Sequence, residues 1–490
     1  MVVIIGAGIS GLSAAYRAAG DCIILEKEDV IGGLSTQYTP PAAPGCRFDF
    51  GGHYFHFKDK LDIKKHVESF ARFREFKRKS KVYILDRYIP FPIQHHLFYL
   101  PARTRNTILK EIIGWVDPAI KPTPPLRGHQ RRNAPFGRVH PNRPPSFVGA
   151  SPPLEGISQQ KSDATNLREF LENHFGRTLY SLFFEPFMSK YYRTELSELA
   201  ADMDKGSIPV PDKKSMIEGA QGRTFADTGY NPVFYYPEQG LKAFIERYAG
   251  RPAPAARKAR DMIPETSHDL HKESIFSPGN NIIKMGGNIK LNEEVIEIDI
   301  DRKRVKTKDK FYDYESLINT MPLKHLLRAI KQKDRFPSYR KLRHISTLVV
   351  NVVLKRRRKR LHWVYLPEGQ FPFYRAGFYP GRDMTVSYLE KTVPGTYSTG
   401  RDSLHDEICF TLGKLGFIED KGEILFFDAK LIPVSYILFD QDWHRTVPPT
   451  LDRLKEYGIY STGRYGAWNY TSMSDDIKAA FNTVEELYDD

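Results

Sequence analysis

Residues 2–33, VVIIGAGISGLSAAYRAAGDCIILEKEDVIGG, decide how this chain is expected to fold. Residues 2–5 form an apolar, β-branched run that is too short for a helix and typical of a buried parallel strand. The glycines of GAGISG follow directly, residues 12–19 have the pattern of a helix, and residues 23–25 form a second buried strand that ends at Glu26. Strand, turn, helix, strand and acid therefore occur in the order of a dinucleotide-binding unit.

The residue types in this stretch suit a dinucleotide for physical reasons. Gly6 permits a tight turn, Gly8 lets the backbone approach a pyrophosphate, and Gly11 lets the helix pack closely on the strand. The helix N-terminus would face the phosphates, and Glu26 would accept a hydrogen bond from a ribose hydroxyl. A glycine-rich turn that binds no ligand is the alternative that this pattern leaves open.

Length and composition limit the classes of protein to consider. A chain of 490 residues can hold two or three domains, or one doubly wound domain with large insertions. No apolar run approaches the roughly 18 residues of a membrane span, and the first strand begins at residue 2, so we expect a cytoplasmic protein without a signal peptide. The three cysteines are not clustered, which indicates neither a disulfide framework nor a metal site.

The basic balance of the chain points to an anionic partner. Its formal net charge is +14, which is compatible with nucleic acid, an anionic membrane surface or an anionic small molecule. Aromatic and basic residues are not interleaved as in a stacking platform for single strands, so we do not expect nucleic-acid binding. Residues 118–160 and 251–278 lose all periodicity and are rich in proline, which predicts flexible insertions.

Four further motifs narrow the interpretation. They are the second glycine pair Gly32-Gly33 with the loop Gly51-Gly52-His53, the stretch GYNPVFYYPEQG at 229–240, HWVYLPEGQFPFYR at 362–375, and GRYGAWNY at 463–470, which is followed by a predicted helix. With the N-terminal fingerprint, these motifs resemble the flavoprotein superfamily of amine oxidases, protoporphyrinogen oxidases and UDP-galactopyranose mutases, and the last two are most similar to the mutases. The resemblance implies FAD rather than NAD as the cofactor.

The resemblance implies an α/β fold: a doubly wound Rossmann-type FAD-binding domain assembled from non-contiguous segments, with an inserted mixed-sheet and helical substrate domain. The expected boundaries are 1–60, 230–330 and 440–490 for the FAD-binding domain, and 61–229 and 331–439 for the substrate domain. Within the latter, the amphipathic pattern of residues 61–76 predicts a helix.

The resemblance also implies two sets of site residues. The residues expected to contact FAD are Gly6, Gly8, Ser10, Gly11, Glu26, Lys27, Gly33, Leu34, Gly51, Gly52, His53, Val295 (through its backbone), Thr320, Arg464, Met473 and Ser474. The residues expected to contact a nucleotide-sugar are Asn231, Tyr236, Trp363, Tyr365, Tyr374, Arg375, Tyr436 and Tyr470. Among all of these, His53, Arg375, Tyr436 and Tyr470 are the candidate catalytic residues.

The chemistry of these residue types fits such a site. Arg375, Tyr436 and Tyr470 could supply cationic and hydroxyl donors to a diphosphate, and Trp363 or Tyr365 could stack on a uracil ring. His53 would lie near flavin N5, and the N-terminus of the last helix would favour a reduced anionic flavin. Ordinary structural roles for Trp363, His53 and Arg464 remain as alternatives.

The implied reaction is a redox-neutral pyranose/furanose isomerisation of a nucleotide-sugar, UDP-galactose above all, through N5 of the reduced flavin. A reductant such as NAD(P)H would then be a partner. An FAD-dependent oxidoreductase of the amine oxidase or protoporphyrinogen oxidase type is the alternative, and a flavin-binding protein without turnover is a third. One departure from the mutases is Ser207 in place of a second diphosphate-binding Arg, which could weaken diphosphate binding by roughly 1.5–3 kcal/mol unless Lys205 or an Arg of an insertion substitutes.

Overall fold

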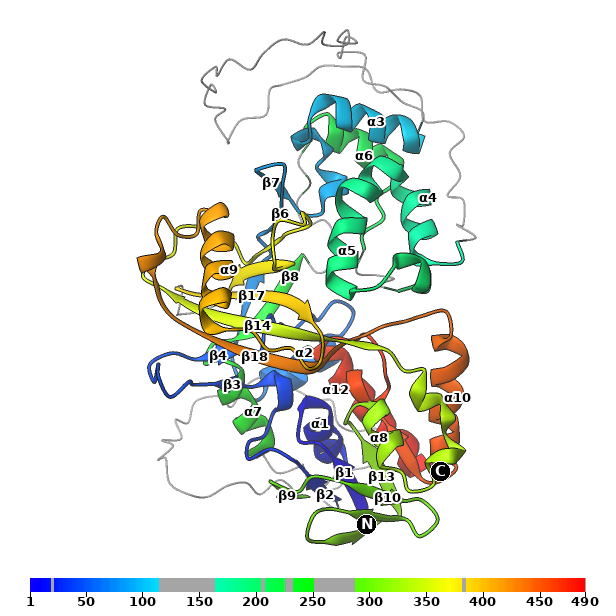
Figure 1. The fold of residues 1–490 in the computed structure, drawn as a ribbon. Helices are drawn as coiled ribbons and strands as arrows, with labels where there is room; N and C mark the ends of the chain where they lie inside the picture. The colour runs from blue at the N-terminus through cyan, green and yellow to red at the C-terminus, as the bar shows by residue number, and fades with distance from the viewer. Residues whose placement is uncertain are drawn as a thin grey trace, which may run out of the picture.

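A computed structural model describes residues 1–18, 22–113, 164–203, 208–223, 225, 232–250, 287–380 and 385–489. Figure 1 shows a lower part built around a parallel sheet, a central mixed sheet and an upper group of helices. The predicted insertions at 118–160 and 251–278, together with Asn231, Lys205 and Ser207, lie outside the described residues. No described helix combines the length and the apolar character that are needed to cross a bilayer.

The parallel sheet gathers strands from distant parts of the chain. In spatial order its strands are β19 (Ile459–Ser461), β13 (Ser316–Asn319), β1 (Val2–Ile5), β2 (Cys22–Leu25) and β9 (Gly287–Lys290), and every neighbouring pair is parallel. The order, with β1 in the middle, is that of a Rossmann-type sheet, as the sequence predicts.

Both faces of this sheet are covered, which explains the unbroken apolar run of β1. Ile4 belongs to the core on the side of three helices, α1 (Ile9–Arg17), α7 (Leu241–Gly250) and α12 (Met473–Asp489). Val3 and Ile5 face the other core, which includes an antiparallel sheet of β10 (Glu297–Asp299), β11 (Arg304–Lys306) and β12 (Phe311–Asp313), together with α8 (Leu323–Ala329) and α10 (Trp443–Lys455). Helix α1 starts at Ile9, earlier than expected, because Gly8 is its N-cap residue.

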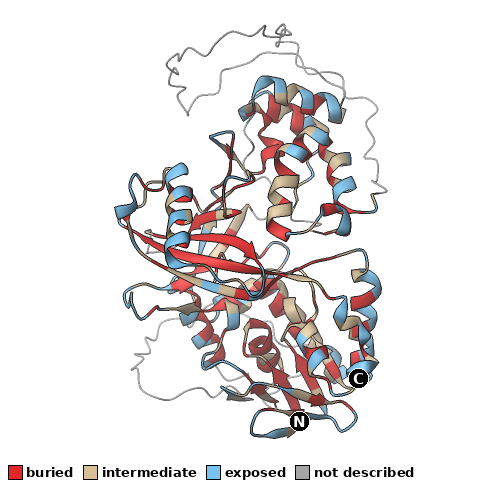
Figure 2. Cartoon of the chain, in the orientation of Figure 1, coloured by how far each residue is buried: buried red, intermediate tan, exposed pale blue. Residues whose placement is uncertain are grey.

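The second sheet is mixed, as predicted. Its strands in spatial order are β18 (Ile424–Ile437), β14 (His344–Leu354), β17 (Val386–Val393), β16 (Arg375–Phe378), β15 (Trp363–Tyr365), β6 (Ser80–Ile84) and β7 (Arg87–Pro90). The one parallel pair in it joins β15 and β6. Helix α9 (Arg401–Lys414) packs on one face, and the opposite face turns toward the parallel sheet. Buried residues are concentrated on both sheets in Figure 2.

The helical layer contains α3 (Ala102–Ile113), α4 (Leu167–Leu179), a π-helical turn at Tyr180–Phe184, α5 (Glu185–Tyr192) and α6 (Lys213–Ala220). The remaining elements are α2 (Leu61–Glu68), α11 (Gly463–Gly466) and two small antiparallel pairs, β3 (Gln37–Tyr38) with β4 (Phe48–Asp49) and β5 (Phe73–Lys77) with β8 (Val233–Pro237).

The predicted helix over residues 61–76 is wrong in its second half. It ends at Glu68, and residues Phe73–Lys77 form strand β5, which pairs with β8 across a long sequence separation. The tertiary pairing with β8 therefore overrides the local helical pattern. The pairing of β5 with β8 bears on the candidate site, because β8 and the segment that follows β4 both approach the second sheet.

Candidate functional site

The glycine-rich turn leaves open space at the position expected to face a phosphate. Gly6 has a φ of +97°, and a Cβ added there would lie 2.5 Å from Thr320 Oγ1, whereas a Cβ on Gly11 would lie 1.9 Å from a main-chain oxygen of the same turn. A Cβ on Gly8 would meet no heavy atom of the described residues within 4 Å. Gly8 also begins α1 without a side-chain cap, so the first-turn N–H groups are available to an anion. The turn thus fits a dinucleotide pyrophosphate.

Glu26 is anchored at the end of β2 in the orientation that a ribose contact requires. Its side chain is buried, with Oε2 accepting a hydrogen bond from the Ala7 N–H at 2.6 Å and Oε1 accepting one from the Glu28 N–H at 3.0 Å. Each oxygen keeps a further lone pair for a ribose hydroxyl. The neighbouring Lys27 is exposed and pairs with Glu28 at 3.1 Å, so its side chain is directed to solvent.

The C-terminal motif closes on this turn. A Cβ on Gly463 would lie 2.2 Å from Ser10 Oγ, and Thr320 Oγ1 donates to the Ile5 carbonyl at 2.7 Å. Ser474 is fully buried at the start of α12, and its Oγ accepts from the His56 N–H at 3.3 Å.

The other predicted cofactor residues are less closely tied to the turn. Gly33 approaches Gly8, since a Cβ added to it would lie 3.4 Å from the Gly8 Cα. Met473 is buried beside Ser474, whereas Leu34 and Val295 are half-buried. Residues that are hundreds of positions apart in the sequence therefore converge around one turn.

The loop Gly51-Gly52-His53 is pressed against β17. Gly51 has a φ of +106°, and a Cβ there would lie 2.8 Å from Glu390 Oε1. The Nδ1 of His53 is buried and has no hydrogen-bond partner in the described part of the chain. Burial, together with the charges of the nearby Arg464 and Arg375, lowers the pKa of His53 to about 4. His53 is therefore neutral at pH 7 and can serve as a hydrogen-bonding group but not as a cation.

Arg464 is held between aromatic rings with part of its guanidinium unused. Its Cζ lies 4.9 Å from the ring centroid of Tyr436 and 4.5 Å from that of Tyr470. One guanidinium nitrogen donates to the Thr471 carbonyl at 3.1 Å. The Nε and the second terminal nitrogen are buried and have no hydrogen-bond partner among the described residues. Buried donors without acceptors are costly, so this arrangement indicates a site for an anionic group.

Arg375 has an internal counterion that sequence reasoning missed. Its Nε donates a hydrogen bond to Glu390 Oε2 at 2.6 Å, and one terminal nitrogen forms an ion pair with the same oxygen at 2.5 Å. The side chains are 18% and 4% exposed, respectively, so the pair is shielded from water. The two residues face each other across β16 and β17. A diphosphate at Arg375 would therefore compete with a carboxylate that is already there.

Aromatic side chains form one wall of the same region. Trp363 stacks on Tyr54 with ring centroids 5.7 Å apart and an interplanar angle of 13°. Tyr191 on α5 contacts Tyr374 and Tyr436, in both cases with centroids 4.8 Å apart. The density of aromatics in YSLFFEPFMSKYY at 180–192 is the sequence signal that predicts this wall.

Tyr236 is placed differently from the other predicted substrate residues. Its hydroxyl donates to the buried carboxylate of Asp49, with 3.0 and 2.8 Å to the two oxygens, and its ring packs edge-on against Tyr54. The ring of Tyr54 therefore lies between Tyr236 and Trp363. Asn231 lies outside the described residues, so its predicted role stays a prediction.

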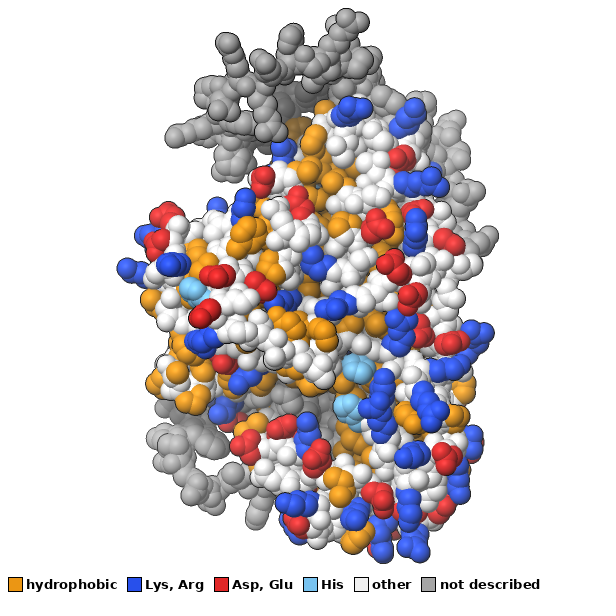
Figure 3. Space-filling view, viewed as in Figure 1, with side chains coloured by type: hydrophobic (Ala, Val, Ile, Leu, Met, Phe, Trp, Pro, Cys, Tyr) orange, Lys and Arg blue, Asp and Glu red, His pale blue; other side chains and the backbone are white. Residues whose placement is uncertain are grey.

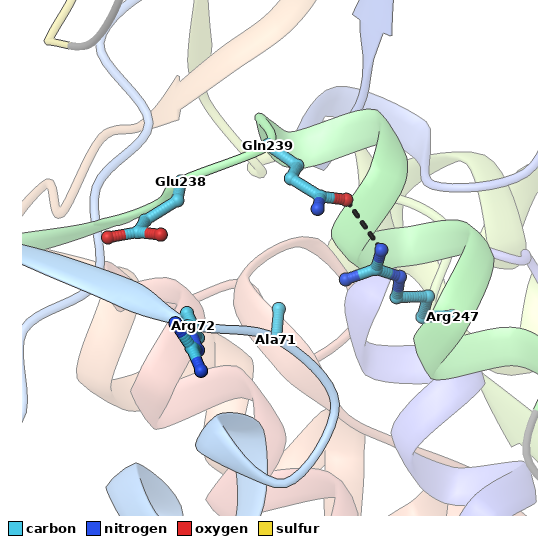
Figure 4. Close-up of a pocket in the computed structure, with 5 residues that line it drawn as sticks. All are labelled: Ala71, Arg72, Glu238, Gln239 and Arg247. Carbon is cyan, nitrogen blue, oxygen red and sulfur yellow. Dashed lines mark hydrogen bonds between the residues drawn. The ribbon is translucent and has the colours of Figure 1, made fainter. Parts of the chain in front are cut away.

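Two other surface features are separate from this cluster. A hollow of about 170 Å³ is lined by Ala71, Arg72, Glu238, Gln239 and Arg247, whose side chains are drawn in Figure 4; it is too small for a dinucleotide and has no predicted site residue in its lining. Basic side chains gather over α8 and α10 on the face shown in Figure 3, which accounts for part of the positive charge.

Comparison with known proteins agrees with this geometry. Residues 4–70 match the family model described as an NAD(P)-binding Rossmann-like domain. The structure is similar to that of a reduced UDP-galactopyranose mutase, with a TM-score of 0.75 and 20% sequence identity, over 100% of this chain and 95% of the mutase.

Two other solved structures also match along the whole chain. An Exiguobacterium sp. 255-15 protein assigned as a protoporphyrinogen oxidase has a TM-score of 0.65 and 15% identity, over 100% of this chain and 99% of its own. A redesigned putrescine oxidase has a TM-score of 0.57 and 12% sequence identity, and the match covers 100% of this chain and 99% of the oxidase. This chain therefore has a Rossmann-like fold at its N-terminus, and its overall fold is that of the UDP-galactopyranose mutase and oxidase structures that the sequence motifs resemble.

Proposed function

We propose that this protein is an FAD-dependent enzyme that acts on a nucleotide-sugar, with a UDP-galactopyranose mutase-like pyranose/furanose isomerisation as its reaction. The observation that carries the proposal is Arg464, a buried guanidinium between Tyr436 and Tyr470 with two donors that have no acceptor among the described residues. A diphosphate would supply acceptors for these donors, in addition to the negative charge of the nearby Asp476 carboxylate. The likeness of the fold to the mutase structure supports the same reading.

The cofactor site fits FAD in the following way. The open backbone at Gly8 and the start of α1 would hold the pyrophosphate, and the anchored carboxylate of Glu26 would hold the adenosine ribose. The loop Gly51-Gly52-His53 and the buried start of α12 would border the isoalloxazine ring. When bound and reduced, FAD supplies a nucleophilic nitrogen for chemistry at the anomeric carbon.

The residues of this chain would bind and orient the substrate. The resemblance assigns Arg464 to FAD, but its unused donors and its place between Tyr436 and Tyr470 favour a role in holding the diphosphate instead, helped by Arg375 to the extent that Glu390 releases it. Trp363, which already stacks on Tyr54, offers an aromatic surface to a nucleotide base. Neutral His53, next to both arginines, would place a hydrogen-bonding nitrogen near the reacting group without adding charge. The aromatic wall on α5 would exclude water.

A comparison of oxidation states tests this proposal. The purified protein is reduced anaerobically with dithionite, or with NAD(P)H as a candidate physiological reductant, and incubated with UDP-galactofuranose, and UDP-galactopyranose is then measured by chromatography. We expect conversion in the reduced sample alone. Arg464→Met should abolish it while leaving bound flavin in place, whereas Arg445→Met, at an exposed arginine paired with Asp442, should not change it. Absence of conversion by a flavin-loaded, reduced protein would refute the mutase reaction.

An FAD-dependent oxidoreductase is the second candidate. The observation that favours it is the Arg375–Glu390 pair, which removes one of the two cations that a nucleotide diphosphate would use. This candidate predicts rapid reoxidation of the flavin that is coupled to an amine or porphyrinogen substrate. The mutase instead predicts turnover with no net change in the flavin absorbance.

A further inference from the structure

One cation outside the predicted site makes an unusual set of contacts. Lys190 lies on α5, and its Nζ donates to the main-chain carbonyls of Leu366, Glu368 and Phe371 at 2.8, 2.6 and 3.0 Å. An ammonium group has three N–H donors, so these three acceptors use all of them. The carbonyls of a single short turn thus converge on one side chain from a different layer of the fold.

The turn that Lys190 holds connects the two strands of the candidate substrate site. It joins β15, which ends at Tyr365, to β16, which begins at Arg375, and these two residues are direct partners in the strand pair. The Leu366 N–H also donates to the Tyr374 carbonyl at 2.9 Å, which closes the base of the turn. A shift of the turn would therefore be passed directly to the positions of Tyr365, Tyr374 and Arg375.

The same helix contacts the side chains of that site. The ring of Phe187 packs edge-on against Tyr365 with centroids 5.2 Å apart, and Tyr191 contacts Tyr374 at 4.8 Å. The Tyr191 carbonyl accepts a hydrogen bond from Thr392 Oγ1 at 2.6 Å, which ties α5 to β17. Helix α5 is therefore attached to the mixed sheet on both sides of the aromatic wall, and Lys190 is its polar attachment to the turn.

The contacts of Lys190 are electrostatically demanding. Burial lowers the pKa of its ammonium to about 8, and the nearby Glu368 carboxylate opposes this effect. Carbonyl oxygens with converging dipoles compensate part of the lost hydration, as they do for a bound cation. A lysine that served packing alone would extend its ammonium to water instead.

We propose that Lys190 is a positioning residue that fixes the turn at 366–371 and thereby sets Tyr365, Tyr374 and Arg375 for the ligand. The identity of that ligand as a nucleotide diphosphate rests on the function proposed above. The attachment of the turn itself does not, because it follows from the contacts of Lys190.

The experiment uses two substitutions at this position and one control. Lys190→Met keeps the aliphatic volume and removes the donors, and Lys190→Ala leaves a vacancy in front of the three carbonyls. The control is Lys324→Met, a similarly half-buried lysine on α8 that donates to the Leu342 carbonyl at 2.8 Å and not to the turn. Hydrogen exchange of the peptide over 366–374 is measured in each flavin-loaded protein, and UDP affinity is measured by tryptophan fluorescence.

We expect exchange over 366–374 to be about tenfold faster in Lys190→Met and unchanged in Lys324→Met. UDP affinity should fall about tenfold in Lys190→Met with bound flavin retained. Propylammonium, but not tetramethylammonium at equal ionic strength, should restore both readouts in Lys190→Ala, because only the former has N–H donors for the three carbonyls.

Two results would overturn this assignment. One is exchange over 366–374 that is as slow in Lys190→Met as in the unmodified protein. The other is equal recovery of exchange and UDP affinity in Lys190→Ala with both ammonium ions. That result would mean that the empty volume, and not the loss of the hydrogen bonds, causes the defect. If the unmodified protein does not bind UDP, the nucleotide-sugar function is refuted, and the exchange measurement still decides the role of Lys190.

Discussion

Replacing Glu390 by Gln is expected to destabilise the protein and, at the same time, to strengthen diphosphate binding. The Glu390 carboxylate accepts a hydrogen bond from Arg375 Nε at 2.6 Å and forms an ion pair with a terminal nitrogen at 2.5 Å, where water has little access. Gln has nearly the same shape but carries no charge, so Glu390→Gln leaves a largely buried guanidinium without its counterion. Removal of one partner from a buried pair costs about 3–5 kcal/mol.

The structure places the expected loss at the lower end of that range. The Arg375 side chain is 18% exposed, so water can solvate part of its charge. We therefore expect the free energy of unfolding to fall by about 3 kcal/mol. At roughly 2–4 °C per kcal/mol for large domains, the melting temperature should fall by about 6–12 °C. The released guanidinium becomes available to a diphosphate, and UDP should bind about tenfold more tightly, which is about 1.4 kcal/mol.

Urea unfolding with and without UDP measures both the loss of stability and the gain in UDP affinity. The variants are Glu390→Gln, Arg375→Met and the double substitution, which together form a double-mutant cycle. The exposed pair Arg304–Asp313, with side chains 43% and 67% exposed, serves as control, and Asp313→Asn should leave the free energy of unfolding almost unchanged. A loss below about 1 kcal/mol for Glu390→Gln, with unchanged UDP affinity, would refute the view that Glu390 neutralises a diphosphate-binding arginine.

Two further predictions concern the turn and a buried acid. Gly8→Ala should fold normally, because its Cβ meets no described atom within 4 Å, but should bind flavin poorly, because that Cβ would occupy the space proposed for the pyrophosphate. Gly11→Ala should not accumulate as folded protein, because its Cβ would lie 1.9 Å from a backbone oxygen. Flavin content and circular dichroism distinguish the two variants. Burial raises the pKa of Asp49 to about 7, so the folded protein pays an increasing cost as pH rises from about 4 to 7. Asp49→Asn should therefore raise the melting temperature at pH 8 and change it little at pH 4, and equal shifts at both pH values would contradict this.

The sequence alone determined those features of the protein that depend on short-range geometry. The tight turn at Gly6 and the close packing at Gly11 are predicted correctly because the turn, the helix and the flanking strands are neighbours in the chain, and the contact of these glycines with a pyrophosphate stays a prediction. The apolar run of β1 predicts a strand buried on both faces, and the structure has it in the middle of the parallel sheet. The position of Glu26 directly after β2 is part of the same local strand–turn–helix–strand unit.

The tertiary structure decided the charges and contacts of the candidate substrate site. Nothing in the motif around Arg375 predicts that Glu390 neutralises it, because the pairing depends on the register between β16 and β17. The attachment of the turn at 366–371 by Lys190 depends on where a separate helical layer docks. The end of α2 at Glu68 likewise depends on a partner strand more than 150 residues away. Local patterns report backbone conformation, but counterions and strand partners are selected by packing between distant segments, which only the folded chain brings together.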